Sequence, residues 1–599
     1  MLRWMLCVLL MMTGLAGASP LGDEVQQRAG VILLTIKDDA SARRAVAEMT
    51  ALADAVSARA SGGQLDAVGV AEGYLSVIRM IESGGSGDIE AVASMMAASP
   101  SFVVELGLLI QDFDEPKGVY RAAGELLRDR GELVEEFASV ASAICVVHDG
   151  DTPYSRRINE NTVNAPGRLA VFDHFVKNRR MMWVDPLRLS PALMVHVVNM
   201  TEQPGQSSWA LERYHANPMI GERFFEIQYD YEHFRTGAPK KVTQSGLYSL
   251  EKIRELGGVC ADQAYFAEGV AKSCSIPSAY VFARGADVSH AWIGYLDVRG
   301  NRAAWNFDAG RYPAYQKLRG NLRDPQGGGL ISDARVGLLG GQYGVRAADR
   351  WAAAGSRLAA GRMHSGAWDG DRDVEFTSRG MRTQPRDGGI GDQLELLRSG
   401  LTRCAFEPGA WELVAEMSEG DEMSFGQLDL WAKAVEKMCG SRYPDFSYDI
   451  VIRLIDSVDD ERARVKMLEW AFGRYKARPD LAAGVRIEQG NLSSKVGDLD
   501  RGWKMYEEVS RRYINDGPMV LTALTKMGEM LSERGRRGEI IPYLEDAVRR
   551  VNRPGSMGAA FAVQSNYFQI HLMLGEELRL AGRVSESGAV LSKIGVRAP

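Results

Sequence analysis

A cysteine, a histidine and an aspartate follow one another in the middle of the chain, and their types suit a nucleophile, a base and a group that orients the base. Cys260 comes directly after Gly257-Gly258-Val259 and begins an apolar-periodic segment. Gly258 can adopt backbone angles closed to other residues, so it allows a sharp turn into a helix. At a helix N-terminus the helix dipole favours the thiolate, which is the nucleophilic form. A buried structural cysteine is the simpler interpretation, and the residues downstream argue against it.

Downstream of Cys260 the sequence predicts a helix followed by three strands. Apolar residues recur at helical spacing, at Ala264, Ala267, Val270, Ala271 and Cys274. Pro277 ends this helix. Runs rich in β-branched and aromatic residues predict strands over 278–283, 288–296 and 303–308, and a hairpin loop is predicted at 297–302.

His290 lies on the second of these strands and Asp308 on the third. Neighbouring antiparallel strands can set an imidazole beside a carboxylate, while the helix start delivers the thiol of Cys260. These three groups are what nucleophilic catalysis by a thiol requires. Asn306 falls on the same strand face as Asp308 and is the rival orienting group. The backbone N–H of Cys260 is one candidate donor for an oxyanion hole.

These segments resemble the transglutaminase-like superfamily, and the resemblance covers roughly residues 200–320. The matching stretches are Gly258-Val259-Cys260-Ala261-Asp262, Ser275-Ile276-Pro277-Ser278-Ala279-Tyr280-Val281, His290-Ala291-Trp292 and Trp305-Asn306-Phe307-Asp308. The resemblance implies that Cys260 is the nucleophile, His290 the base and Asp308 the orienting group. Two departures leave the substrate class open. Ala309 replaces the proline that often follows the aspartate, and Gln263 replaces a common aromatic residue.

The resemblance implies an α+β fold with a papain-like core, in which the cysteine-bearing helix packs on an antiparallel sheet. It also implies acyl transfer from an amide bond of a protein or peptide substrate, without a cofactor. Transfer to water would make the protein a protease or amidase, and transfer to a lysine would form a cross-link. Similarity to exported relatives favours hydrolysis. The alternative is a non-catalytic interaction scaffold that retains the same fold.

Composition and charge narrow the classes of protein to which the chain can belong. The 599 residues suffice for about three or four domains. Hydrophobic residues make up 45% and charged residues 25%, as in an average globular protein. The net charge of -7 is small and basic residues are spread out, which argues against a nucleic-acid partner. No Cys-x-x-Cys or His-x-x-x-His spacing occurs, so no metal site is expected.

The N-terminus predicts a secretory signal peptide over residues 1–18. Arg3 gives a positive start, residues 2–15 are apolar, and Ala16-Gly17-Ala18 suits a cleavage site. We therefore expect a secreted or periplasmic protein with no stable membrane span after cleavage, and the alternative is an uncleaved anchor. The cysteines beyond the signal peptide are Cys145, Cys260, Cys274, Cys404 and Cys439. Their odd number predicts at least one unpaired thiol, and a disulfide between Cys404 and Cys439 is one possible pairing that their spacing alone does not establish.

Four segments follow the signal peptide. The pattern predicts a helical domain at 19–145, the transglutaminase-like domain at 146–320, a Gly-rich linker or loop region at 321–395 and a helical domain at 396–599. Three isolated histidines of the second segment are expected to be structural: His148, His174 and His196.

The last helical segment contains three loosely similar helix–turn–helix stretches. Their turns contain Gly497, Gly535 and Gly582. The stretches resemble degenerate tetratricopeptide-type hairpins, which usually bind protein or peptide segments. A protein partner is therefore predicted at these helices, and a plain helical bundle is the alternative.

Overall fold

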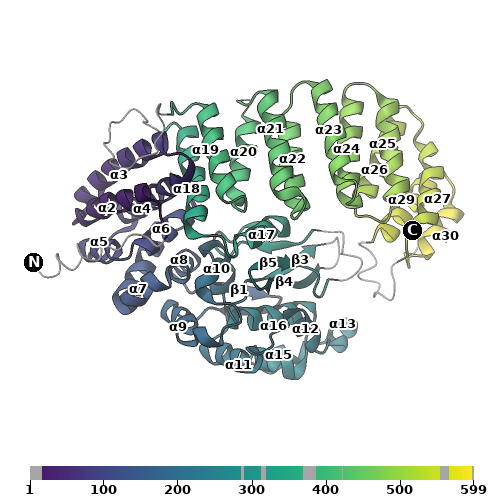
Figure 1. Cartoon of the computed structure of the whole chain (residues 1–599). Coiled ribbons are helices and arrows are strands. Elements are labelled where there is room, and N and C mark those ends of the chain that lie inside the picture. The colour runs from purple at the N-terminus through teal and green to yellow at the C-terminus, as the bar shows by residue number, and fades with distance from the viewer. Residues whose placement is uncertain are drawn as a thin grey trace, which may run out of the picture. The chain divides into compact units, whose positions relative to one another are not determined.

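The computed structural model describes residues 17–284, 289–311, 319–367, 386–420, 422–553 and 565–596. The chain forms two compact units. The first comprises residues 1–281, 291–310 and 321–417, and the second comprises residues 282–290, 311–320 and 418–599. Helices dominate both, and a five-stranded sheet accompanies them, so the predicted α+β class is confirmed (Figure 1). Most of the signal peptide predicted at 1–18 lies outside the described residues.

The predicted N-terminal helical domain is made of helices, as the sequence indicates. They are α2 (Pro20–Leu34), α3 (Asp39–Arg59), α4 (Asp66–Gly84), α5 (Ile89–Ala97), α6 (Pro100–Leu109), α7 (Pro116–Glu136) and α8 (Ala138–Val147). Asp38 starts α3 with a capping box, in which its side chain accepts the N–H of Ser41. Helix α4 is buried along most of its length and packs against α2, α3, α6 and α7.

The region 321–395 differs from its prediction as a linker. It contains β6 (Asn321–Arg323), β7 (Leu330–Ser332), α17 (Asp333–Leu339), the 3-10 turn η5 (Gly340–Gln342) and α18 (Ala347–His364), while residues 368–385 lie outside the described chain. Helix α18 packs on α4 of the N-terminal domain. A Cβ on Gly355 would lie 2.3 Å from the Cα of Gly69, so glycine permits this close approach. Arg362 binds Glu72 and Asp54 across the same contact.

Short elements lead from the N-terminal helices to the cysteine-bearing helix α16 (Cys260–Ser273). They are β1 (Ser155–Ile158), β2 (Asn161–Asn164), α9 (Arg168–Asn178), η2 (Arg179–Met181), η3 (Pro186–Arg188), α10 (Pro191–Val198), α11 (Pro204–Tyr214), α12 (Ile220–Glu226), α13 (Tyr231–Thr236), α14 (Lys241–Gln244) and α15 (Leu250–Leu256). All residues of α16 are buried. Its charged Glu268 is compensated by Arg156 and Lys272, each 2.6 Å away.

The five-stranded sheet has the order β5-β4-β3-β6-β7. The three predicted strands are β3 (Ser278–Arg284), β4 (Ser289–Arg299) and β5 (Arg302–Asn306). Strands β4 and β5 are antiparallel, with Arg299 opposite Arg302 across a two-residue turn. Gly300 begins that turn with a φ of 64°. The third strand is shorter than predicted, because β5 ends at Asn306 and leaves Asp308 in the following loop.

The C-terminal segment continues as helices. They are α19 (Ile390–Arg403), α20 (Pro408–Glu419), α21 (Phe425–Val435), the π-helix η6 (Glu436–Gly440), α22 (Pro444–Asp456), α23 (Glu461–Tyr475), α24 (Pro479–Lys495), α25 (Leu499–Arg512), α26 (Met519–Glu533), η7 (Arg537–Ile540), α27 (Ile541–Arg550), α29 (Asn566–Leu580) and α30 (Val584–Ser592). Helices α21 to α26 each pack on the next one along the chain, as Figure 1 shows for this unit.

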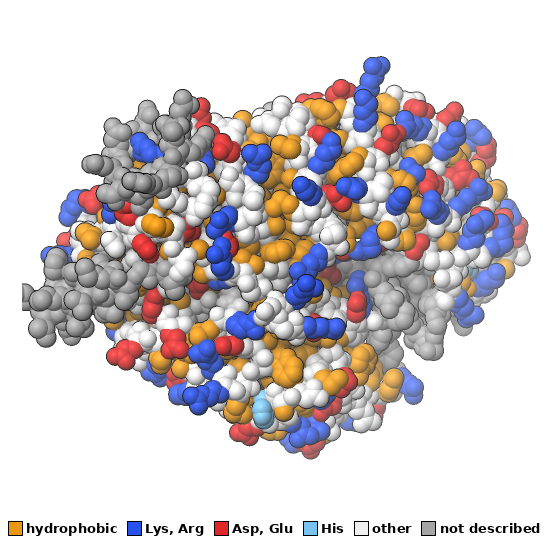
Figure 2. Space-filling view, viewed as in Figure 1, with side chains coloured by type: hydrophobic (Ala, Val, Ile, Leu, Met, Phe, Trp, Pro, Cys, Tyr) orange, Lys and Arg blue, Asp and Glu red, His pale blue; other side chains and the backbone are white. Residues whose placement is uncertain are grey.

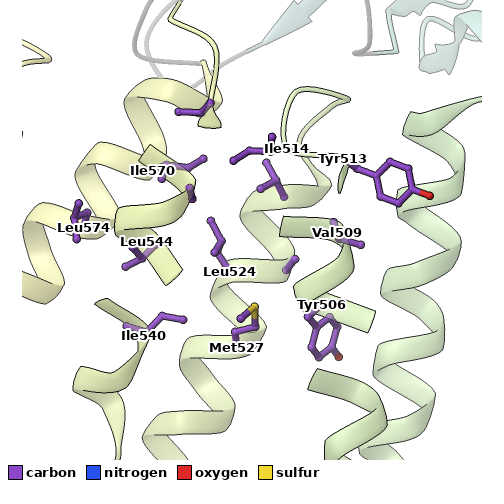
Figure 3. Packing of buried hydrophobic residues seen from close by; sticks show 14 of the residues in the cluster. Tyr506, Val509, Tyr513, Ile514, Leu524, Met527, Ile540, Leu544, Ile570 and Leu574 are labelled. Carbon is purple, nitrogen blue, oxygen red and sulfur yellow. The ribbon is translucent and has the colours of Figure 1, made fainter. Parts of the chain in front are cut away.

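The three predicted helix–turn–helix stretches are present, and each turns at the predicted glycine. Gly497, Gly535 and Gly582 have φ angles of 85°, 68° and 76°. Figure 3 shows the apolar core of this unit, in which Val509, Leu524 and Ile570 come from three different helices. The surface of these helices mixes acidic and basic side chains on the face shown in Figure 2.

Among the described residues, no single helix is long and apolar enough to cross a membrane. Helices α5 and α6 are long and apolar enough for a membrane span only when they are counted together, and the chain bends by 107° between them.

Candidate functional site

The turn before Cys260 is held by backbone pairing with a distant segment. The N–H of Gly258 donates to the Gln228 carbonyl at 3.0 Å, and the Gly258 carbonyl accepts the N–H of Asp230 at 2.9 Å. Gly257 has a φ of 79° and a ψ of -176°, a conformation that is essentially confined to glycine. The sequence analysis assigned this freedom to Gly258, and the structure corrects that assignment. Gly258 is needed for space, because a Cβ there would lie 2.4 Å from the Cβ of Asp262.

Asp262 anchors the first turn of α16 in a buried charged cluster. Its carboxylate accepts the N–H of Val259 at 2.8 Å, which completes a capping interaction. Lys240 donates to both carboxylate oxygens, at 2.7 and 3.0 Å, and the hydroxyl of Tyr248 donates at 2.7 Å. The side chains of Lys240 and Asp262 are both 0% exposed. Because a buried charge is costly unless it is paired, this pair fixes the position of the helix start.

Cys260 is the first residue of α16 and is 8% exposed. Burial is the largest influence on its thiol and raises its pKa above the ordinary value. Hydrogen bonds from the backbone N–H groups of Ala291, Ala261 and Cys260 itself act in the opposite direction, and the negative charge of Asp262 adds to the rise. The direction of this shift is opposite to the one expected from the helix dipole, because burial and the acidic Asp262 both favour the neutral thiol.

His290 lies on β4 and is 0% exposed. It directly precedes Ala291, whose backbone N–H lowers the pKa of the Cys260 thiol. The backbone next to His290 is thus brought to Cys260. His290 is also the last residue of the short segment 282–290 that belongs to the second compact unit.

Asp308 is exposed and lies two residues beyond the end of β5. Its N–H donates to the side-chain oxygen of Asn306 at 2.9 Å. The paired register of β4 and β5 ends at Tyr295 and Asn306, so Asp308 lies in the loop that follows β5.

The rival orienting group is engaged elsewhere on the hairpin. The side-chain amide of Asn306 donates to the hydroxyl of Tyr295 at 3.3 Å, and its oxygen accepts the Asp308 N–H. The N–H of Ile293 donates to the Ala309 carbonyl at 3.3 Å, so the chain gains one residue after Asn306 relative to the regular register. This irregularity explains why Asp308 leaves the strand.

The sequence analysis missed two features of the site. The first is the N–H of Ala291, since a backbone donor on another strand has no sequence signal. The second is the cluster of Asp262 with Lys240 and Tyr248. An acidic residue three positions after a helix N-cap is a capping signal, so Asp262 was detectable, but nothing local indicates its lysine partner.

The remaining cysteines and histidines have structural surroundings. The five cysteines that the structure describes are buried and form no disulfide with one another, so the pairing of Cys404 with Cys439 is not found. His148 is buried against the Val198 carbonyl, and burial lowers its pKa to about 4. In the described part of the chain, no group of three or more His, Cys, Asp or Glu side chains is placed to hold a metal ion.

No protein-family model matches the chain, and neither a curated protein nor a solved structure matches it.

Proposed function

We propose that this protein is a transglutaminase-like cysteine enzyme with a papain-like core, which attacks amide bonds of protein or peptide substrates. The observation that carries the proposal is the surrounding of Cys260. The thiol belongs to the first residue of a buried helix, and the backbone N–H groups of its own turn and of Ala291, the residue after His290, lower its pKa against the effect of burial. Such donors suit a sulfur that becomes negative as it reacts.

In the proposed mechanism His290 removes the proton of the Cys260 thiol as the sulfur attacks the substrate carbonyl. The C–S bond forms, the carbonyl oxygen becomes an oxyanion, and the N–H of Cys260 is its candidate donor. His290 then gives its proton to the leaving amine as the C–N bond breaks. Because the pKa of the Cys260 thiol is raised, proton removal accompanies attack rather than preceding it. Asp308 orients the imidazole in this proposal, and Asn306 is the rival.

The acyl group next passes from Cys260 to water or to an amine. We favour water, which makes the protein an exported protease or amidase that needs no cofactor. The signal-peptide pattern supports a secreted or periplasmic location. The row of C-terminal helical pairs supports a protein or peptide partner there.

A second candidate is a non-catalytic scaffold with the same fold. One observation favours it, the raised pKa of the buried Cys260 thiol. Under this candidate the cysteine is a packed core residue and the molecule acts by binding alone.

A peptide-library digest separates the two candidates. The chain from residue 19 onward is incubated with mixed peptides, with and without a primary amine, and products are identified by mass. We expect cleaved or deamidated products with the native protein and with Cys274→Ser, and none with Cys260→Ser. Cys274 is the matched control because it lies at the far end of the same helix. Products that persist in Cys260→Ser, or no product from any variant, would favour the scaffold.

A further inference from the structure

A half-open cavity of about 160 Å³ lies within the first compact unit, and Cys260 is not among its lining residues. Helices α6, α10, α17 and α18 contribute to its wall, together with the loop between β6 and β7. An engineered apolar cavity of about 150 Å³ holds benzene, so this one has room for roughly six non-hydrogen atoms. Phe113 lines the cavity and is exposed, which places the opening beside it.

The wall has an apolar part and a charged part. The apolar part includes Leu108, Leu109, Val195 and Leu339. The charged part pairs arginines with carboxylates, as in Arg350 with Glu105 at 3.3 Å. An occupant must therefore combine a short apolar body with a polar end.

The polar part of the lining includes a hydrogen-bond donor without an acceptor. The indole N–H of Trp351 has no hydrogen-bond partner among the described residues, and Trp351 is 4% exposed. Arg357 is held by long contacts, at 3.4 Å from a terminal guanidinium nitrogen to the Leu108 carbonyl and at 3.4 Å from its Nε to the Glu407 carboxylate. Both side chains can only donate. Leaving a buried donor without an acceptor costs about 1–3 kcal/mol, so a ligand with acceptor oxygens fits this part of the lining.

Charged side chains of both signs line the cavity: Arg335, Arg350 and Arg357 beside Glu105, Asp324 and Glu407. Burial raises the pKa of Glu105 and of Glu407, which makes these two carboxylates easier to protonate than exposed ones. His196 also lines the cavity, and its pKa is lowered to about 3 by burial and by the nearby Lys272 and Arg335, so it is neutral near pH 7.

We propose that this cavity binds a short-chain monocarboxylate. Its carboxylate accepts from the indole N–H of Trp351 and the guanidinium of Arg357, and its alkyl chain lies on the apolar wall formed by Leu108, Val195 and Leu339. A chain of four carbons matches the available volume. The site is independent of Cys260 and needs no catalytic step.

Calorimetric titration with butyrate, butylamine and 1-butanol tests the proposal on the full chain. These three probes share a four-carbon body and differ in the polar end. We expect butyrate to bind with a dissociation constant of about 1 mM, within the limit that so few atoms can reach, and the other two to bind far more weakly. Trp351→Phe keeps an aromatic ring and loses only the N–H, so it should weaken butyrate binding by about tenfold.

Arg357→Met should weaken butyrate binding at least as much. Arg398→Gln is the matched control, because Arg398 is an exposed arginine on the neighbouring α19, and it should bind like the native protein. Cys260→Ser should also bind normally. If Arg357→Met does not fold, as judged by its circular dichroism, Trp351→Phe alone decides.

Equal binding of butyrate and 1-butanol would overturn the proposal, since an apolar cavity without polar recognition would then suffice. No heat change with butyrate up to roughly 20 mM would also overturn it, because the donors would then be satisfied by water. Binding that Trp351→Phe leaves unchanged would place the ligand elsewhere and overturn it as well.

Discussion

Cys260 and Cys274 lie at the two ends of α16 and differ in what surrounds the sulfur. Cys274 is 0% exposed, and burial alone raises the pKa of its thiol to about 12. Cys260 keeps a small exposed fraction and receives three backbone N–H groups that oppose the effect of burial. The two thiols therefore form an internal comparison for reactivity.

We predict that a small alkylating agent labels Cys260 faster than Cys274 at every pH. Labelling of Cys260 should rise about tenfold per pH unit up to pH 9, because its pKa is raised and the thiolate is the reactive form. Alkylation across pH, with the modified peptide identified by mass, measures this. A plateau below pH 7 would contradict it and indicate a thiolate at rest. His290→Ala should slow the reaction if the imidazole assists deprotonation.

Asp262→Asn should separate the electrostatic role of this carboxylate from its structural role. Loss of its charge should lower the pKa of Cys260 and speed labelling at neutral pH. It should also remove the buried counter-charge of Lys240 and leave only the half-exposed Glu160, 3.3 Å from its Nζ, which costs up to about 3 kcal/mol in the free energy of unfolding. Denaturant unfolding measures that loss. The double variant Asp262→Asn, Lys240→Met should recover much of it, and no recovery would show that the charge pair is not the cause.

Asp114 provides a pH-dependent prediction. Burial is the main cause that raises the pKa of Asp114 to about 7, although its carboxylate accepts from Gln111 and Gln326. The folded state therefore holds a proton that the unfolded chain releases near pH 4. The protein should lose up to about 4 kcal/mol of this contribution as pH rises from 4 to 7. Asp114→Asn should be more stable than the native protein at pH 8 and not at pH 4, by unfolding at both values. Equal differences at both would refute the assignment.

At the residue scale, sequence reasoning located Cys260 at a helix start and Cys274 on a buried face, because both follow from local periodicity. The direction of the Cys260 pKa was not predictable. It depends on burial and on a donor from β4, which only the folded chain brings together. The place of Asp308 depended on one extra residue after Asn306, and no pattern in the sequence marks it.

At the element scale, three of the C-terminal helices end in the same C-cap motif. After α24, α26 and α29 a glycine takes a positive φ, and the following N–H closes back on a carbonyl five residues earlier, as Asp498 does to Ser493 at 2.9 Å. This is the pattern of a Schellman cap. Glycine avoids the penalty that a Cβ brings in the left-handed conformation.

Alanine at Gly497, Gly535 or Gly582 should therefore cost about 1 kcal/mol each in the free energy of unfolding. Gly473 is the matched control. Gly473 is exposed inside α23 and does not have a positive φ. Gly473→Ala should therefore raise the free energy of unfolding by about 0.8 kcal/mol. Thermal or denaturant unfolding of the four variants measures both signs. A cap variant that matches Gly473→Ala would contradict the argument.

Helices and strands with a clear hydrophobic period could be predicted from the sequence. Elements whose place depends on packing against distant segments could not. The strands β3 and β4 follow from β-branched and aromatic runs. The region 321–395 was predicted as a linker because it is rich in Gly, Arg and Asp, with short helices expected only in parts such as 347–360. Helix α18 covers that part, and its Gly355 permits close packing on α4, which depends on a segment far away in the sequence.

At the scale of the whole molecule, the chain crosses between its two units several times. The second unit contains residues 282–290 and 311–320 as well as the helices from residue 418 onward. Arg319, in the second of these short segments, pairs with Asp445 and Asp449 of α22. The sequence suggested domains that follow one another along the chain. It carries no signal that two short segments before residue 321 group with helices that begin only after residue 417.

This arrangement has a consequence for synthesis on the ribosome. Residues 282–290 and 311–320 emerge before the whole of 321–417 is made, and the helices they group with come only after that. At about 5–20 residues per second, these segments wait several seconds for their partners. A nascent chain that has reached Met417 therefore carries the complete sequence of the first unit, together with two short segments of the second unit whose remaining residues are still to be made.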